Sequence, residues 1–169
     1  AMQERVTEDC LSALHEGALD VIVIAHQPDA DTGIASQKLF SEDFVLACSR
    51  NHALAQRKAV HAKDIPDDEL LLLEEGHCLR EQSMLYCERI KRHPRQDLSA
   101  TSLSTLMAMV ALNEGVTLLP SMAVPYFKKQ HLVFLNITPK VARTLYVCWR
   151  QSMPRAALVA RLHAVMAAC

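Results

Sequence analysis

Short apolar runs alternate with helical patterns along this chain, and this alternation limits the folds that it can adopt. Residues 21–25 (VIVIA) form a mostly β-branched run that follows a helical pattern over residues 6–19. The run is predicted to be a strand buried on both faces. A further helix is predicted over residues 103–113, with Ser102 as its N-cap and Gly115 as its C′ residue. Strands that alternate with helices in this way predict an α/β fold.

The other predicted elements are shorter and favour two lobes. Strands are expected at residues 34–39, 40–49, 70–73, 98–101, 116–119, 132–135 and 143–150, and helices at residues 78–92 and 156–168. A short helical or turn segment is expected at residues 121–129, and a connector at residues 59–68. The first and last helices are expected to pack on the strand at residues 21–25, which brings both ends of the chain together. The predicted lobe I therefore comprises residues 1–43 and 152–169, and the predicted lobe II comprises residues 44–151.

Composition excludes several classes of function. Half of the 169 residues are hydrophobic and the net charge is −1, so the chain can build a core but offers no basic stripe to neutralise phosphates. This argues against nucleic-acid binding by the chain alone. No apolar run approaches the roughly 20 residues that span a membrane, and no signal-peptide pattern is present. The abrupt, charged start is typical of a fragment boundary.

The chain contains six cysteines, at positions 10, 48, 78, 87, 148 and 169. In a core-rich chain of this size without a secretion signal, a reducing compartment is expected. Most thiols there are small buried hydrophobic residues. The informative question is therefore which of the six cysteines is reactive and not simply buried in the core.

Cys78 has the sequence surroundings of a reactive thiol. It follows Gly76, which allows a sharp turn after the apolar run at residues 70–73, and it is predicted to open a helix. Unpaired backbone N–H groups and the positive end of the helix dipole favour a thiolate there. His77 and Arg80 add donors or positive charge nearby.

Cys87 follows nine positions later on the same predicted helix. At a rise of ~1.5 Å per residue the two Cα atoms would lie ~13 Å apart, whereas a disulfide needs about 7 Å or less. A bond between them would require residues 79–86 to unwind, which suits a sensor better than a catalyst. Two structural thiols that share a helix by chance remain an alternative. A zinc site fits poorly, because the spacing matches no short C-x₂₋₄-C pattern.

Residues 76–87 (GHCLREQSMLYC) closely resemble the redox centre of the OxyR family, the hydrogen-peroxide sensors among the LysR-type transcriptional regulators. Residues 64–78 and 100–124 resemble the segments that flank this centre in the family. Residues 14–25 and 143–150 are similar to it more loosely.

This resemblance implies a two-lobed, periplasmic-binding-protein-like (type 2) regulatory domain that lacks its N-terminal part. Cys78 would be the peroxidatic residue, oxidised to a sulfenic acid, and Cys87 the resolving residue that forms a disulfide with it. Thr7, His77, Arg80 and Arg150 would line the peroxide pocket. No metal or cofactor is implied.

The resemblance also implies partners and a setting. Hydrogen peroxide would be the signal, and the chain would form a homodimer or tetramer. DNA and RNA polymerase would be contacted only through the full-length protein, and thioredoxin or glutaredoxin systems would reduce the disulfide. The expected setting is the bacterial cytoplasm, without membrane contact, and the expected role is a switch and not an enzyme.

Two departures from the family pattern are visible. The family's domain has a strand and a helix before the segment that matches Gln3, and a DNA-binding domain before those. The missing strand carries a pocket threonine in the family, so the peroxide site of this chain is expected to be incomplete. Asp97 stands where the best-known member of the family has a histidine near the pocket.

Two other functions stay open at the level of sequence. One is a LysR-type domain that binds a small organic effector between its lobes, where Thr101 and Ser102 at a helix N-terminus would suit a carboxylate. The other is a thiol peroxidase or disulfide oxidoreductase, which the required unwinding makes less suitable.

Overall fold

The structure is a computed structural model, which describes residues 3, 5–95, 97–152 and 164–165. Contacts between residues divide the chain into two compact units. Unit 1 comprises Ala1–Ser41 and Arg143–Cys169, and unit 2 comprises Glu42–Ala142. The lobe boundaries at residues 43–44 and 151–152 stay a prediction.

Unit 1 is a small α/β layer. Helix α1 (Thr7–His15) precedes strand β1 (Val21–Ile24), which pairs antiparallel with β8 (Ala142–Arg150) so that Ile22 faces Cys148. Leu14 of α1 packs on the buried side of this pair, together with Ile24 and Ile34. Val23, however, is 38% exposed, so the expectation that both faces of the strand are buried is wrong. On the same face, Val147 of β8 is nevertheless fully buried and packs with Leu39 and Val21.

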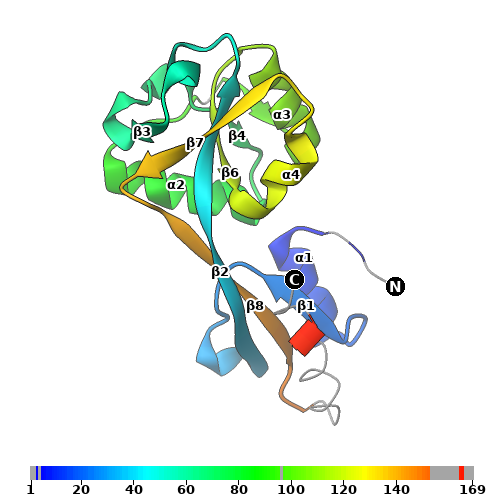
Figure 1. Ribbon diagram of the computed structural model, residues 1–169. Coiled ribbons are helices and arrows are strands. Elements are labelled where there is room, and N and C mark those ends of the chain that lie inside the picture. The colour runs from blue at the N-terminus through cyan, green and yellow to red at the C-terminus, as the bar shows by residue number, and fades with distance from the viewer. Residues whose placement is uncertain (1–2, 4, 96, 153–163, 166–169) are drawn as a thin grey trace. The chain divides into compact units, whose positions relative to one another are not determined.

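Strand β2 (Ile34–Ser49) is a single strand of 16 residues that contributes to both units (Figure 1). The prediction of two separate strands, at residues 34–39 and 40–49, is wrong. The partners of β2 change along its length: β8 is its neighbour in the first half, and β6 (Thr117–Pro120) and β7 (Leu132–Thr138) flank the second half. A strand whose buried face changes with its partners does not keep one alternating pattern, which explains why the sequence suggested a break.

Unit 2 combines several short strands with helices and loops (Figure 1). β7 pairs with β2 on one side and, in parallel, with β3 (Ala59–His61) on the other, so the connector predicted at residues 59–68 in fact contains a strand. β4 (Leu72–Leu73) and β5 (Ser99–Ala100) form a separate parallel pair. Short 3₁₀ turns lie at Ala30–Thr32 in unit 1 and, in unit 2, at Ala53–Gln56, Ala62–Asp64, Asp67–Glu69 and Ser121–Ala123.

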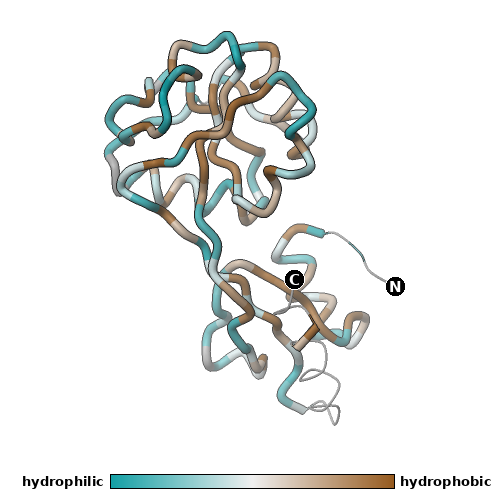
Figure 2. The backbone as a smooth tube through the Cα atoms, in the orientation of Figure 1, coloured by the Kyte–Doolittle hydropathy of each residue, from teal (hydrophilic) through white to brown (hydrophobic). Residues whose placement is uncertain are grey.

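The helices of unit 2 are α2 (Cys78–Ile90), α3 (Leu103–Ala111) and α4 (Val124–Phe127). Together with the strands they enclose one core, in which fully buried side chains include Leu46, Leu71, Leu106, Met107, Leu118 and Leu119. Figure 2 shows how hydropathy is distributed along the backbone: apolar residues lie on the inner strands of unit 2 and polar residues on its outer loops.

The predicted start of α3 is correct, whereas the predicted C′ residue at its end is not. Ser102 is the N-cap, as predicted, and its Oγ accepts a hydrogen bond from the Thr105 N–H (3.1 Å). The helix ends at Ala111, with Leu112 as the C-cap. Asn113 takes the left-handed conformation (φ 68°) in place of Gly115, so the predicted C′ residue is wrong.

Gly115 is needed for a different reason. A Cβ built on it would lie 2.3 Å from the Glu69 carbonyl oxygen, which accepts a hydrogen bond from the Val116 N–H (2.7 Å). The glycine therefore allows two backbone segments to approach each other closely.

Most of the last predicted helix, residues 156–168, lies outside the described residues. Within the described part of the chain, no helix is long and apolar enough to cross a membrane.

Candidate functional site

The start of α2 is formed by a tight turn that follows β4. Gly76 has a φ of 88°, and His77 is extended and serves as the N-cap residue, but its side chain makes no capping hydrogen bond. The His77 carbonyl oxygen accepts from the Arg80 N–H (2.8 Å) and the Glu81 N–H (3.3 Å), which begins the helix at Cys78. The first N–H groups of an α-helix have no acceptor within the helix. Cys78, which is half-buried, therefore lies where negative charge is stabilised.

Arg80 is fastened across this turn. Its Nη1 donates a hydrogen bond to the Leu73 carbonyl oxygen (2.7 Å), and its side chain is half-buried. The guanidinium is consequently held beside the end of β4. Three of the predicted site residues, His77, Cys78 and Arg80, are thus brought together in one short segment.

Cys87 lies in the interior of unit 2. It is 1% exposed and belongs to the same core as Leu79 and Tyr86. Because α2 is continuous from Cys78 to Ile90, the predicted helix between the cysteines is confirmed, although it ends two residues earlier than expected. Nine helical residues hold the two Cα atoms ~13 Å apart, which no disulfide can bridge. The structure is therefore that of the dithiol form.

The C-terminal end of α2 is closed by a Schellman motif. Lys91 has a φ of 55°, the Arg92 N–H donates to the Cys87 carbonyl oxygen (2.8 Å), and the Lys91 N–H donates to that of Glu88 (3.1 Å). Arg92 also donates a side-chain hydrogen bond to the Lys63 carbonyl oxygen. These bonds satisfy the backbone carbonyl groups at the end of the helix.

Thr7 and Arg150 belong to unit 1. Thr7 is buried at the first position of α1. The Arg150 guanidinium donates hydrogen bonds to the carbonyl oxygens of Leu14 and Leu19 (2.7 Å for Leu19), and so neutralises the C-terminal end of α1. Arg150 therefore stabilises unit 1, and roles for Thr7 and Arg150 toward peroxide stay a prediction.

Asp97 lies on the surface of unit 2 and forms a two-point ion pair with Arg95 (3.1 Å and 3.0 Å). The hydrogen bond from Arg95 lowers the pKa of the Asp97 carboxyl group, which stays ionised. The carboxylate of this residue is thus engaged with a neighbour two positions away.

The other described cysteines have surroundings unlike those of Cys78. Cys48 and Cys148 are fully buried, and burial raises the pKa of each thiol to about 11. Cys10 is half-buried and donates weakly to the Arg5 carbonyl oxygen (3.8 Å). Thiolate formation at neutral pH is thus disfavoured at Cys48 and Cys148. In the part of the chain that the structure describes, no group of three or more potential metal ligands is found.

The sequence analysis missed Tyr86. Its side chain is 3% exposed, and its hydroxyl group donates to the Pro139 carbonyl oxygen (3.4 Å). The only local signal was an aromatic residue beside Cys87, since Pro139 is 53 positions away.

Comparison with known proteins decides the family. The model of the LysR substrate binding domain matches residues 1–168. The chain belongs to this family. Its fold is accordingly the periplasmic-binding-protein-like α/β fold of LysR regulatory domains, as predicted.

The chain is similar to several regulators. It is 37% identical over 155 residues to the DNA-binding transcriptional dual regulator OxyR of Escherichia coli K12, which covers 90% of this chain and 50% of that protein. It is 38% identical over 158 residues to a probable hydrogen peroxide-inducible genes activator of Mycobacterium avium, covering 89% of this chain and 50% of that protein. The chain thus spans about half the length of these relatives.

Solved structures give the same result. The reduced form of OxyR matches with a TM-score of 0.85 at 33% identity, over 99% of this chain and 79% of that chain. The oxidised form of OxyR matches with a TM-score of 0.84 at 34% identity, over 99% and 80%. The reduced OxyR regulatory domain of Pseudomonas aeruginosa matches with a TM-score of 0.88 at 29% identity, over 100% and 82%.

Proposed function

We propose that this chain is the redox-sensing regulatory domain of a LysR-type transcriptional activator that responds to hydrogen peroxide. The observation that carries the proposal is the placement of two cysteines on one continuous helix, Cys78 at its start without a side-chain cap and Cys87 buried in its interior. The similarity to proteins named hydrogen peroxide-inducible genes activators supports it.

The first chemical step takes place at Cys78. Its thiolate attacks one oxygen of hydrogen peroxide, the O–O bond breaks, and the products are a sulfenic acid and, after protonation, one water molecule. The helix N-terminus and the Arg80 guanidinium stabilise the thiolate, and the His77 side chain orients the oxidant. Thr7 and Arg150 are proposed as further contacts to peroxide, a role that only substitution tests.

The second step joins the two cysteines. The Cys87 thiolate attacks the sulfur of the Cys78 sulfenic acid, the S–O bond breaks, and a second water leaves. The overall change is two thiols and one hydrogen peroxide to one disulfide and two water molecules. Because the Cα atoms must come from ~13 Å to about 7 Å or less, residues 79–86 unwind, and this unwinding is the signal that the domain transmits.

The proposal has a wider setting. The domain acts as part of a homodimer or tetramer, and DNA and RNA polymerase are contacted by the full-length protein. Thioredoxin or glutaredoxin systems reduce the disulfide in the bacterial cytoplasm, where thiols are normally kept reduced. The sensor needs no metal or cofactor, and it works once per oxidation and not as a turnover enzyme.

A direct experiment tests the proposal. Reduced protein is treated with one equivalent of hydrogen peroxide, and its disulfides are mapped by mass spectrometry. We expect a Cys78–Cys87 linkage in the wild type, a trapped sulfenic acid in Cys87→Ser, and neither in Cys78→Ser, while Cys48→Ala behaves as the wild type. A wild type without this linkage, or a linkage that survives Cys78→Ser, would sink the proposal.

A domain that binds a small organic effector is the second candidate, and the family's description as a substrate-binding domain favours it. The Ser102 hydroxyl group, however, already accepts the Thr105 N–H at the start of α3, which leaves less of this helix end for a carboxylate. A thermal-shift series with small carboxylic acids tests it: a shift of several degrees in the reduced protein, without any response to peroxide, would select the effector.

A further inference from the structure

The turn between β7 and β8 is held by α2. The Tyr86 hydroxyl group, on the residue before Cys87, donates to the carbonyl oxygen of Pro139, the first residue after β7 (3.4 Å). The same turn is tied to β2, because the Phe44 N–H donates to the Val141 carbonyl oxygen (2.8 Å) and Lys140 pairs with Asp43 (2.9 Å). All of these residues belong to unit 2. The hydrogen bond from Tyr86 thus joins the helix that carries both cysteines to the turn that leads into β8.

Tyr86 lies in the part of α2 that cannot keep its conformation in a Cys78–Cys87 disulfide. The Schellman motif satisfies the backbone carbonyl groups of Cys87 and Glu88 at the C-terminal end of α2, so we place the shortening between the two cysteines, within residues 79–86. Buried residues of this segment, Leu79, Ser83 and Tyr86, have to leave their positions when it unwinds. The bond from Tyr86 to Pro139 is therefore available to the dithiol form and lost in the disulfide form.

We propose that Tyr86 is a positioning residue that sets how readily the disulfide forms and that releases the β7–β8 turn when it does. This proposal rests on the proposed function. It adds a second structural consequence of oxidation, because the β7–β8 turn loses its hydrogen bond to α2. A hydrogen bond present in only one redox form shifts the equilibrium toward that form. The tie thus favours the dithiol form and opposes oxidation.

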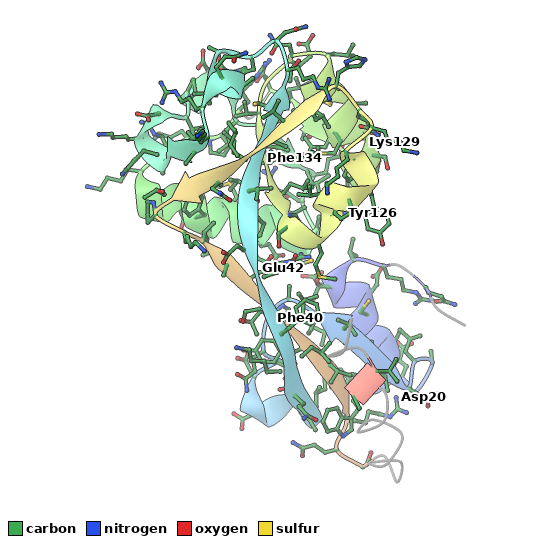
Figure 3. The ribbon with its side chains drawn as sticks, in the orientation of Figure 1. Asp20, Phe40, Glu42, Tyr126, Lys129 and Phe134 are labelled. Atoms are coloured by element: carbon green, nitrogen blue, oxygen red, sulfur yellow. The ribbon has the colours of Figure 1, made fainter. Side chains whose placement is uncertain are left out.

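The test compares Tyr86→Phe with the wild type in glutathione redox buffers, using the whole 169-residue chain. Phenylalanine keeps the buried ring and removes only the hydroxyl group. We expect the dithiol–disulfide equilibrium to move about 2- to 10-fold toward the disulfide, where tenfold corresponds to a midpoint potential about 30 mV more negative. Tyr126→Phe is the matched control, because Tyr126 is 83% exposed and points outward from α4 (Figure 3).

A second measurement separates positioning from general stabilisation. Chemical denaturation of both redox forms should show that Tyr86→Phe destabilises the dithiol form and leaves the disulfide form unchanged, whereas a purely structural role would weaken both equally. In hydrogen exchange, the amides of Lys140 and Val141 should exchange faster in the oxidised wild type, and already faster in reduced Tyr86→Phe.

The outcomes are distinguishable. An unchanged equilibrium in Tyr86→Phe, or equal destabilisation of both forms, overturns this inference alone. A wild type in which no Cys78–Cys87 disulfide forms overturns the proposed function and this inference with it.

Discussion

The Arg80 guanidinium donates a hydrogen bond to the Leu73 carbonyl oxygen at 2.7 Å, so a positive charge in the first turn of α2 is fastened to the strand that precedes the helix. This bond limits the conformations of a side chain that would otherwise extend into water. It also spans the turn between β4 and α2.

Removal of this charge should slow the reaction of Cys78 with peroxide. On the proposed function the guanidinium stabilises the thiolate by an amount on the order of 1 kcal/mol, so its removal should slow oxidation about fivefold. Stopped-flow measurement of sulfenic acid formation in Arg80→Ala checks this, with Arg80→Lys expected to recover part of the rate. Arg57→Ala, which removes a surface pair with Asp64, is the control and should leave the rate unchanged.

Substitution of Gly115 by alanine should destabilise the protein strongly. The new Cβ would lie 2.3 Å from the Glu69 carbonyl oxygen, and because that atom is backbone it cannot move aside without shifting its segment. We expect a loss of about 3 kcal/mol in the free energy of unfolding, measured by urea denaturation. Gly33→Ala is the comparison: its φ is 66° but its surroundings are open, so about 1 kcal/mol is expected. Equal losses at the two sites would contradict the close approach at Gly115.

Removal of the N-cap of α3 should destabilise the protein less than the substitution of Gly115. Ser102→Ala removes the acceptor of the Thr105 N–H and should cost about 1 kcal/mol of folding stability. Ser104→Ala, at the second position of the same helix and exposed, should be neutral or slightly stabilising. Thermal unfolding of the two variants side by side checks the difference, and a reversed order would show that the cap contributes nothing.

Because Cys48 and Cys148 are buried, the free energy of unfolding should fall as the pH rises through the alkaline range. Each thiol ionises at about pH 9 in the unfolded chain and at about pH 11 in the folded protein. The unfolded state therefore loses its proton first, and the stability that each thiol contributes is complete below pH 9 and lost as the pH rises toward 11. Two pH units correspond to about 2 to 3 kcal/mol per thiol.

Urea denaturation at pH 8 and pH 11 measures this effect. Between those values, Cys48→Ala and Cys148→Ala should each lose about 2 to 3 kcal/mol less than the wild type does, because a thiol that is absent cannot ionise. Parallel losses in all three proteins would show that these thiols ionise equally in both states.

Local chemistry explains what the sequence could predict. Gly76 and Ser102 predict the starts of α2 and α3, because a turn and a helix cap depend on neighbouring residues alone. Both helices begin where expected. The proximity of His77, Cys78 and Arg80 follows from the same local geometry. These features need no knowledge of the rest of the fold.

The features that the sequence could not predict depend on contacts between residues far apart in the chain. Gly115 looked like the end of a helix, whereas its real constraint comes from Glu69, 46 positions earlier. β2 looked like two strands because its partners change along its length. Tyr86 had no visible role because Pro139, which accepts its hydrogen bond, follows 53 positions later.

The two ends of α2 have a consequence for the sensitivity of the proposed sensor. No side chain caps the start of the helix, and a lysine occupies the left-handed position at its end, where glycine would be more favourable by about 1 kcal/mol. The helix is therefore less stable than its 13 residues would permit. Since the free energy needed to unwind it opposes formation of the disulfide, a weakly closed helix lowers the oxidant concentration at which the domain responds.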